Sequence, residues 1–247
     1  MKPSLALIPL CLMTLFLTGC AGLTPQRAQD PTAWDRARAI QSLNQDIKTS
    51  KGMAQITVLH GGKRQRLGMA WAAQAPNRAR IILTASGQPI ETIIADGKKV
   101  TFFSHTRAHA PHTTASADPD LTSLTHIPVK MSDLIAVLLG QIPTMDFDSA
   151  QVTSTTQLIL KKKWGPRQQR LGFMPNGKIK KLECFTRENL ADYTLLYKRW
   201  KSFQDHEIPK DFSIQGRQGD QMDILVLKFF PNVPIKEKAF RLTPTGS

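Results

Sequence analysis

Four histidines lie within 22 residues in the middle of the chain and raise the question of a metal site. They are His105, His109, His112 and His126. Imidazole nitrogens are common ligands of zinc and copper, usually together with thiolates or carboxylates. The segment contains no cysteine, and its nearby carboxylates are Asp118 and Asp120. A solvated loop that happens to contain histidines explains this composition better, and we expect neither a metal ion nor another cofactor.

Patterns that carry catalysis occur only in incomplete form. Gly172–Lys178 imitates a phosphate-binding loop but lacks the final Ser or Thr and is typical of a hairpin turn. Residues 206–210 begin like a zinc-protease motif, but Pro209 is incompatible with the helix that this motif needs. Asp146 and Asp148 could serve glycoside hydrolysis, although two acids in a turn explain them better. We therefore expect no catalytic residues and no enzyme. Of the functions considered, that of a periplasmic hydrolase has the least support.

A different chemistry is indicated at the start of the chain. Lys2 precedes an apolar stretch over 5–17, which is too short to cross about 30 Å of hydrocarbon as a helix. The sequence Leu17-Thr18-Gly19-Cys20 then resembles the lipobox of bacterial lipoproteins. In that family the cysteine thiol receives a diacylglycerol, the leader is removed just before it, and the new amine is acylated. The resemblance implies a signal peptide over 1–19 and lipidation of Cys20; the alternative is an ordinary leader and a stray thiol.

An acylated Cys20 would attach the mature chain to a membrane without crossing it, since two or three acyl chains anchor a protein stably. Residues 20–30 would then form the lipidated N-terminus and a polar tether. By the same resemblance, Ala21 favours the periplasmic face of the outer membrane. The formal net charge of +14 has two explanations: contact with anionic headgroups, for example through Lys161–Lys163, or a basic surface that only keeps the chain soluble. Nucleic acid is not expected as a partner, because no binding motif is present.

The elements that would position these residues are mostly strands. An apolar stripe at helical spacing predicts one amphipathic helix over about 31–49. Residues 54–102 alternate with a period of two and are divided by turn signals into five short strands. Strands resume near Val152 and continue to Phe230, which gives about 11 in total. The last of them, 222–230, is apolar on both faces, which predicts cover on both sides.

Two segments interrupt the strands. Residues 105–126 are rich in Ser, Thr, Ala, His and Pro and predict a long loop, which in a compact domain is usually functional or disordered. Residues 134–139 are apolar on nearly every side and predict a short buried helix that covers or plugs the sheet. We therefore expect a mainly β (α+β) fold, a strongly curved antiparallel sheet that forms an unclosed barrel over a single domain, 31–247.

This arrangement resembles the LolA/LolB-type lipoprotein carriers, whose fold is an unclosed barrel with helical lids. The residues that carry the resemblance are the phrase 71–80 (WAAQAPNRAR), the Ala95-Asp96-Gly97 hairpin and the apolar helix beginning near Asp133. The resemblance implies an outer-membrane carrier of acylated lipoproteins. The connection 85–89 lacks the exposed leucine that LolB uses for membrane insertion.

An apolar concave face in such a sheet would form a pocket for a hydrophobic ligand. The residues expected to line it are Trp71, Ile81, Leu83, Ile94, Phe102, Leu134 and Leu138. The main hypothesis is a monomeric lipoprotein that binds acyl chains of a lipoprotein or lipid in this cavity. The alternative is a structural or assembly lipoprotein whose barrel is filled by its own side chains and whose surface binds a partner protein. Periodicity cannot separate the two, because a cavity wall and a core use the same alternation.

Overall fold

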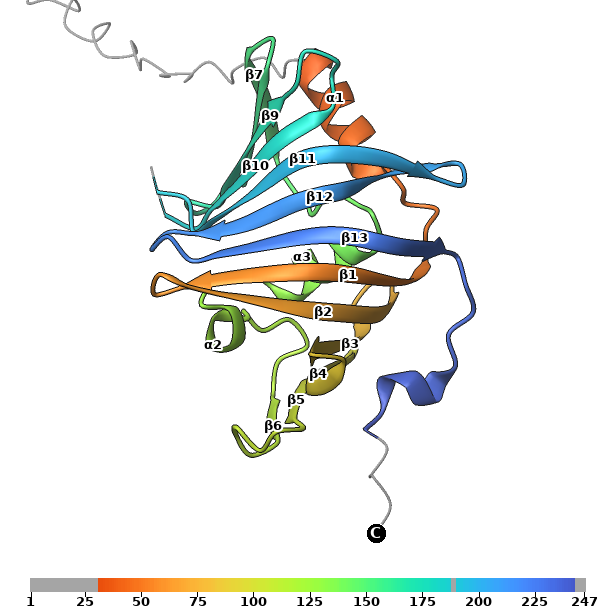
Figure 1. Cartoon of the computed structure of the whole chain (residues 1–247). Coiled ribbons are helices and arrows are strands. Elements are labelled where there is room, and N and C mark those ends of the chain that lie inside the picture. Colours follow the sequence, from red (N-terminus) through yellow and green to blue (C-terminus); the bar gives the residue numbers. More distant parts are fainter. Residues whose placement is uncertain (1–30, 188–189, 243–247) are drawn as a thin grey trace, which may run out of the picture.

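The computed structural model describes residues 31–187 and 190–242, and one large sheet dominates them. Its 13 strands are antiparallel and follow the order β6-β5-β4-β3-β2-β1-β13-β12-β11-β10-β9-β8-β7. The sheet is strongly curved, and its edge strands β6 and β7 do not pair with each other (Figure 1). The predicted mainly β fold with an unclosed antiparallel barrel is therefore confirmed.

The N-terminal half of the sheet consists of β1 (Thr49–His60), β2 (Lys63–Gln74), β3 (Arg78–Ala85), β4 (Gln88–Asp96), β5 (Val100–Ser104) and β6 (His112–Thr114). The C-terminal half consists of β7 (Ser149–Ser154), β8 (Gln157–Lys161), β9 (Gln168–Phe173), β10 (Ile179–Phe185), β11 (Tyr193–Phe203), β12 (His206–Gly216) and β13 (Gln221–Pro231). The helices are α1 (Pro31–Ser42), α2 (Thr122–Thr125), α3 (Met131–Leu138) and the 3-10 turn η1 (Glu237–Phe240). None of the helices in this part of the chain is long and apolar enough to cross a membrane.

The sheet has 13 strands where the alternation predicts about 11. The segment 105–126 is not one continuous loop, because it contains the three-residue strand β6 and the single turn of α2. Strands β7 and β8 are separated by only two residues, 155 and 156. Such short elements escape a periodicity test because they contain too few residues to display a period.

Helix α1 is shorter than predicted, since it ends at Ser42 rather than near residue 49. Asn44 adopts the left-handed backbone conformation at φ 56°, which ends the helix. Its buried side-chain amide donates hydrogen bonds to the carbonyls of Gly140 (2.7 Å) and Glu207 (2.9 Å). The apolar stripe continues to Ile47, which is buried although it lies in the turn before β1. Because Ile47 is buried without being helical, the apolar stripe predicts a helix longer than the observed one.

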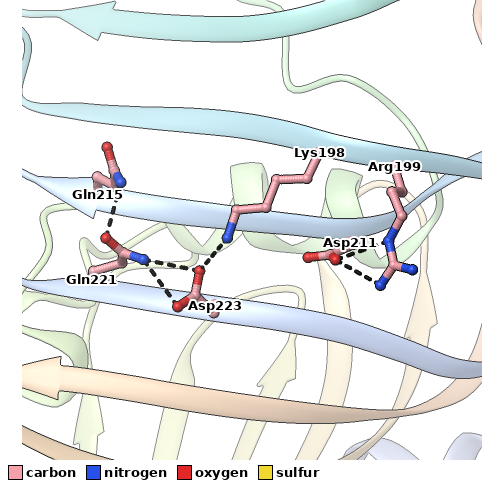
Figure 2. A network of polar contacts seen from close by, with 6 residues as sticks. All are labelled: Lys198, Arg199, Asp211, Gln215, Gln221 and Asp223. Atoms are coloured by element: carbon pink, nitrogen blue, oxygen red, sulfur yellow. Dashed lines mark hydrogen bonds and ion pairs between the residues drawn. The ribbon is translucent and has the colours of Figure 1, made fainter.

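The two faces of the sheet have different characters. The inner face carries the buried positions, and α3 lies against it behind the central strands in Figure 1. The outer face of β11–β13 carries ion pairs and hydrogen bonds in contact with solvent (Figure 2). Lys198 contacts Asp223 at 2.7 Å and Arg199 contacts Asp211 at 2.8 Å. Such cross-strand polar pairs keep this face in water.

The expected cover over both faces of β13 is only partly present. Its inner residues Met222, Ile224 and Val226 are buried, but Leu227 is 54% exposed and Phe230 is 48% exposed. A bulge between β1 and β13 causes part of this difference, because the pairing passes from Lys228 directly to Val226 and leaves Leu227 outside the ladder. Met53 on β1, beside the bulge, is also exposed. Met53 and Leu227 line one hollow, and Phe230 lies two residues beyond Lys228, the partner of Met53. We call these three exposed apolar side chains the outer patch.

Candidate functional site

Helix α3 divides the interior of the curved sheet into two hollows of different character. Its residues Leu134 and Leu138 face an apolar cavity bounded mainly by β1–β4. Its first turn, with Ser132 and Asp133, faces a polar pocket bounded by β9–β11. The helix thus covers part of the inner face, as the sequence predicts, but leaves space on either side.

The apolar cavity has a volume of about 350 Å³. The strand residues that form its wall are Ile56, Val58, Leu67, Met69, Ile81, Leu83, Ile90, Ile93, Phe212, Met222 and Ile224. They belong to strands on both sides of the β1–β13 pair, so the wall depends on the curvature of the sheet. Small-molecule sites typically measure roughly 300–1,000 Å³ and are mainly apolar with a few polar groups, and this cavity lies at the lower end.

Segment 104–126 contributes to the cavity lining through residues near its two ends, and we call this segment the lid. Leu121, which is fully buried, and Leu124 turn from α2 toward the cavity. His126 follows α2 at φ 58° and stacks on His60 with ring centroids 3.5 Å apart. His60 Nδ1 lies 2.7 Å from an oxygen of Asp220 in the β12–β13 turn. The stacked imidazoles therefore join the lid to the rim of the sheet.

Four of the seven residues predicted for the cavity lie at its wall, namely Ile81, Leu83, Leu134 and Leu138. Trp71 does not, because its indole packs over Gly52 and donates a hydrogen bond to Ser50 Oγ at 3.0 Å. Phe102 is buried beneath His112, whose ring stacks on it at 4.7 Å. Both are core residues and not cavity residues.

Ile94 lies on the opposite face of the sheet from the cavity. The pairing of β3 with β4 skips Ile90, so Leu83 pairs with Glu91 and Ile81 pairs with Ile93. This bulge reverses the alternation, and Ile94 pairs with Arg80 on the outer face. Arg80 in turn donates a hydrogen bond to a carbonyl of η1, which contacts β3 and β4. A strict period of two cannot detect such a bulge.

The same bulge places an acid in the apolar wall, which the sequence analysis missed. Glu91 lies in the wall between Ile90 and Ile93, and only 9% of its side chain is exposed. Its Oε2 accepts a hydrogen bond from Nε2 of His109 in the lid at 3.0 Å. His109 Nδ1 lies 2.9 Å from the carbonyl oxygen of Ala110. This carbonyl and the Glu91 carboxylate raise the pKa of His109 above its ordinary value.

The polar pocket on the other side of α3 has a volume of about 550 Å³ and contains Cys184. Burial raises the pKa of the Cys184 thiol to about 12, so it is protonated near neutral pH. Burial also raises the pKa of Asp133 and, well above its ordinary value, that of Tyr193, which donates a hydrogen bond to Asp133. Gln169 donates a hydrogen bond to the Cys184 sulfur at 3.4 Å. A protonated thiol without an adjacent base is a packing group and a poor nucleophile.

The other sequence candidates do not come together into a site. His105 contacts Thr92, whereas His109 contacts Glu91 and His112 stacks on Phe102. The rings of His109 and His112 meet edge to face with centroids 5.3 Å apart, but no further metal ligand joins them among the described residues. Among the residues described, no cluster of His, Cys, Asp and Glu has the geometry to hold a metal ion. Residues 206–210 lie in β12 and not in a helix. The predicted signal peptide, Cys20 and the tether lie outside the described residues.

The comparisons with known proteins concern the fold. No family model and no curated protein sequence matches this chain. Among solved structures, a LolA superfamily protein from Nitrosomonas europaea superposes with a TM-score of 0.59 and 9% identity. The chain has a LolA-type fold. The match covers 85% of this chain and 97% of the other protein, and it confirms the fold that the sequence resemblance implies.

A second neighbour is a DUF1329 family protein from Desulfovibrio piger, with a TM-score of 0.61 and 10% identity. It covers 85% of this chain and 96% of its own. Identities this low carry the architecture and not the ligand, because one fold serves many functions. The function must therefore be argued from the cavity itself.

Proposed function

We propose that the protein binds an acyl chain of a lipoprotein or lipid in the apolar cavity, as a non-enzymatic carrier in lipoprotein localisation or lipid transfer. The observation that carries the proposal is the cavity of about 350 Å³ between α3 and β1–β4 in a LolA-type fold. Its walls are rigid strands, and its lid contributes the apolar side chains Leu121 and Leu124.

The driving force is the removal of the chain from water. Each buried methylene contributes about 0.8 kcal/mol, so a chain that enters only part-way still gains several kcal/mol. The small volume suits one acyl chain rather than three. A multiply acylated ligand would therefore leave its other chains outside this cavity.

The anchor belongs to the same proposal. Diacylglycerol and N-acyl groups on Cys20 would hold the protein at the periplasmic face of the outer membrane, with residues 20–30 as the tether. Trp164 is 83% exposed at the β8–β9 turn and follows three lysines, Lys161–Lys163. An exposed indole beside cationic side chains suits the interface of an anionic bilayer. This turn therefore supports contact with headgroups.

The test uses leaderless protein with Cys20→Ala, so that it remains soluble. Binding of the neutral dye Nile red is titrated, and a triacylated lipopeptide is added as competitor. We expect saturable binding with displacement, and we expect Leu83→Trp, which fills the cavity, to weaken binding at least tenfold. Leu196→Trp on the outer face of β11 is the matched control, because Leu196 is also half-buried but does not line the cavity.

Failure of a folded, monomeric sample to bind the dye would contradict the proposal. The alternative would then gain weight, namely a structural or assembly lipoprotein whose interior is self-filled and whose surface binds a partner protein. Equal loss of binding in both tryptophan variants would also contradict a role for this cavity.

A further inference from the structure

Among the described residues that line the apolar cavity, Glu91 is the one acidic residue. It occupies an inner-face position on β4, opposite Leu83 in the pairing of β3 with β4. Its side chain is nine-tenths buried. A carboxylate in such a wall weakens the hydrophobic surface unless its oxygens are hydrogen-bonded.

Only one of the two oxygens has a partner. Oε2 lies 3.0 Å from His109 Nε2, whereas Oε1 is buried and has no hydrogen-bond partner within residues 31–187 and 190–242. Leaving a buried acceptor unpaired is costly, more so when it is charged. Most buried polar atoms in proteins are paired, so an unpaired oxygen on a residue that lines a cavity points to a ligand.

We propose that Glu91 Oε1 accepts a hydrogen bond from the head group of the ligand, and that this ligand is a single-chain amphiphile with a hydroxyl or amine donor. The proposal rests on the proposed function, since it concerns the same cavity. It adds that the ligand is selected by its head group as well as by its chain. A free fatty acid is disfavoured, because its carboxylate would meet a second carboxylate.

The remaining polar residues near Glu91 are consistent with this selection. Ser104 pairs with Glu91 across β4 and β5, and Thr106 and Thr125 line the same cavity. The described residues that line the cavity include no lysine or arginine. An anionic head group would therefore find no fixed cation. Of the three described histidines that line the cavity, His109 donates to Glu91, and His60 and His126 stack on each other.

The test measures displacement of Nile red by four ligands with chains of twelve carbons. Dodecanol and dodecylamine carry a donor, dodecyl methyl ether carries none, and laurate carries a negative charge. The proteins are the leaderless Cys20→Ala chain and the same chain with Glu91→Leu or Glu91→Gln. Glu183→Gln is the control, because Glu183 also has a buried oxygen without a hydrogen-bond partner among the described residues but does not line the cavity. The guanidinium of Arg170 lies 3.8 Å from that oxygen.

We expect a donor-bearing ligand to bind roughly tenfold more tightly than the ether, since one hydrogen bond to a charged group contributes about that factor. Glu91→Leu should lower the affinity of this ligand to that of the ether, while the ether itself binds no more weakly. Glu91→Gln should retain part of the preference, and Glu183→Gln all of it. Tighter binding of dodecylamine than of dodecanol would identify an amine as the head group. Tighter binding of dodecanol would identify a hydroxyl.

Equal affinities for all four ligands in the parent protein would overturn this inference but leave the acyl-binding proposal intact. A preference that survives in folded Glu91→Leu would also overturn it. Failure of the dye and of every dodecyl ligand to bind would instead contradict the proposed function itself.

Discussion

At the scale of single residues, close packing decides which aromatic side chains are structural. An added Cβ at Gly52 would lie 2.1 Å from the Trp71 ring and 2.6 Å from the Lys228 carbonyl oxygen. Gly52→Ala should therefore destabilise the protein by about 1–3 kcal/mol or more, as overpacking does. Urea unfolding measures the change, and Gly172→Ala is the control strand glycine, since its Cβ would meet nothing closer than 3.7 Å. Equal stability of the two variants would contradict this packing.

The His109–Glu91 pair predicts a pH dependence. The Ala110 carbonyl and the Glu91 carboxylate raise the folded-state pKa of His109, so the folded protein binds this proton more tightly than the unfolded chain. The stabilisation should be complete below about pH 6.5, the unfolded value, and should be lost as the pH rises through the higher folded value. The measurement is the stability difference between the parent and His109→Gln from pH 5.5 to 8.5. A difference that grows with pH would contradict the sign.

Sequence reasoning at this scale succeeded where alternation is regular and failed where it is not. Ile81 and Leu83 lie in the unbroken part of β3 and reach the cavity wall. The bulge at Ile90 shifts the register by one residue, so Glu91 lies on the inner face and Ile94 on the outer face, the reverse of what regular alternation predicts. Pro89, directly before the bulge, is the one signal in 88–96, because proline within a sheet is confined to edges, strand starts and bulges. The residue with the most specific chemistry in the cavity was therefore missed for a physical reason.

At the scale of elements, α3 is held against the sheet by buried hydrogen bonds as well as by apolar contacts. Ser50 Oγ donates to the Leu138 carbonyl at 2.6 Å and accepts from the Trp71 indole at 3.0 Å. Gln141 donates from the same end of the helix to the carbonyls of Asn44 and Ile47. The C-terminal end of α3 is thus fixed to β1 and to the turn before it. The apolar run 134–139 predicted burial, but the pattern could not reveal these distant partners.

The Ser50 bonds predict that Ser50→Ala destabilises the fold by about 1–3 kcal/mol, because a buried donor and a buried acceptor both lose their partner. Hydrogen exchange should show the largest loss of protection in the last turn of α3. Ser42→Ala is the control, since Ser42 is exposed and bonds only within α1. Unchanged protection of α3 in Ser50→Ala would show that apolar contacts alone hold the helix.

At the scale of the whole molecule, two apolar regions could meet a lipid. One is the cavity inside the curved sheet, and the other is the outer patch of Met53, Leu227 and Phe230. The curvature of the sheet follows from the number of strands and was predictable from the sequence. The outer patch was not, because alternation in 222–230 indicates apolar residues on both faces but not whether anything covers the outer one.

The most direct test of the central claim is to locate the acyl chain. A dodecanol analogue with a diazirine at its far end is bound to the leaderless Cys20→Ala protein, irradiated, and mapped by peptide mass spectrometry. We predict adducts in β1–β4 and α3, at residues such as Ile81, Leu83, Leu134 and Leu138, and their loss in Leu83→Trp. Adducts confined to the outer patch would contradict the account and would place the lipid outside the barrel.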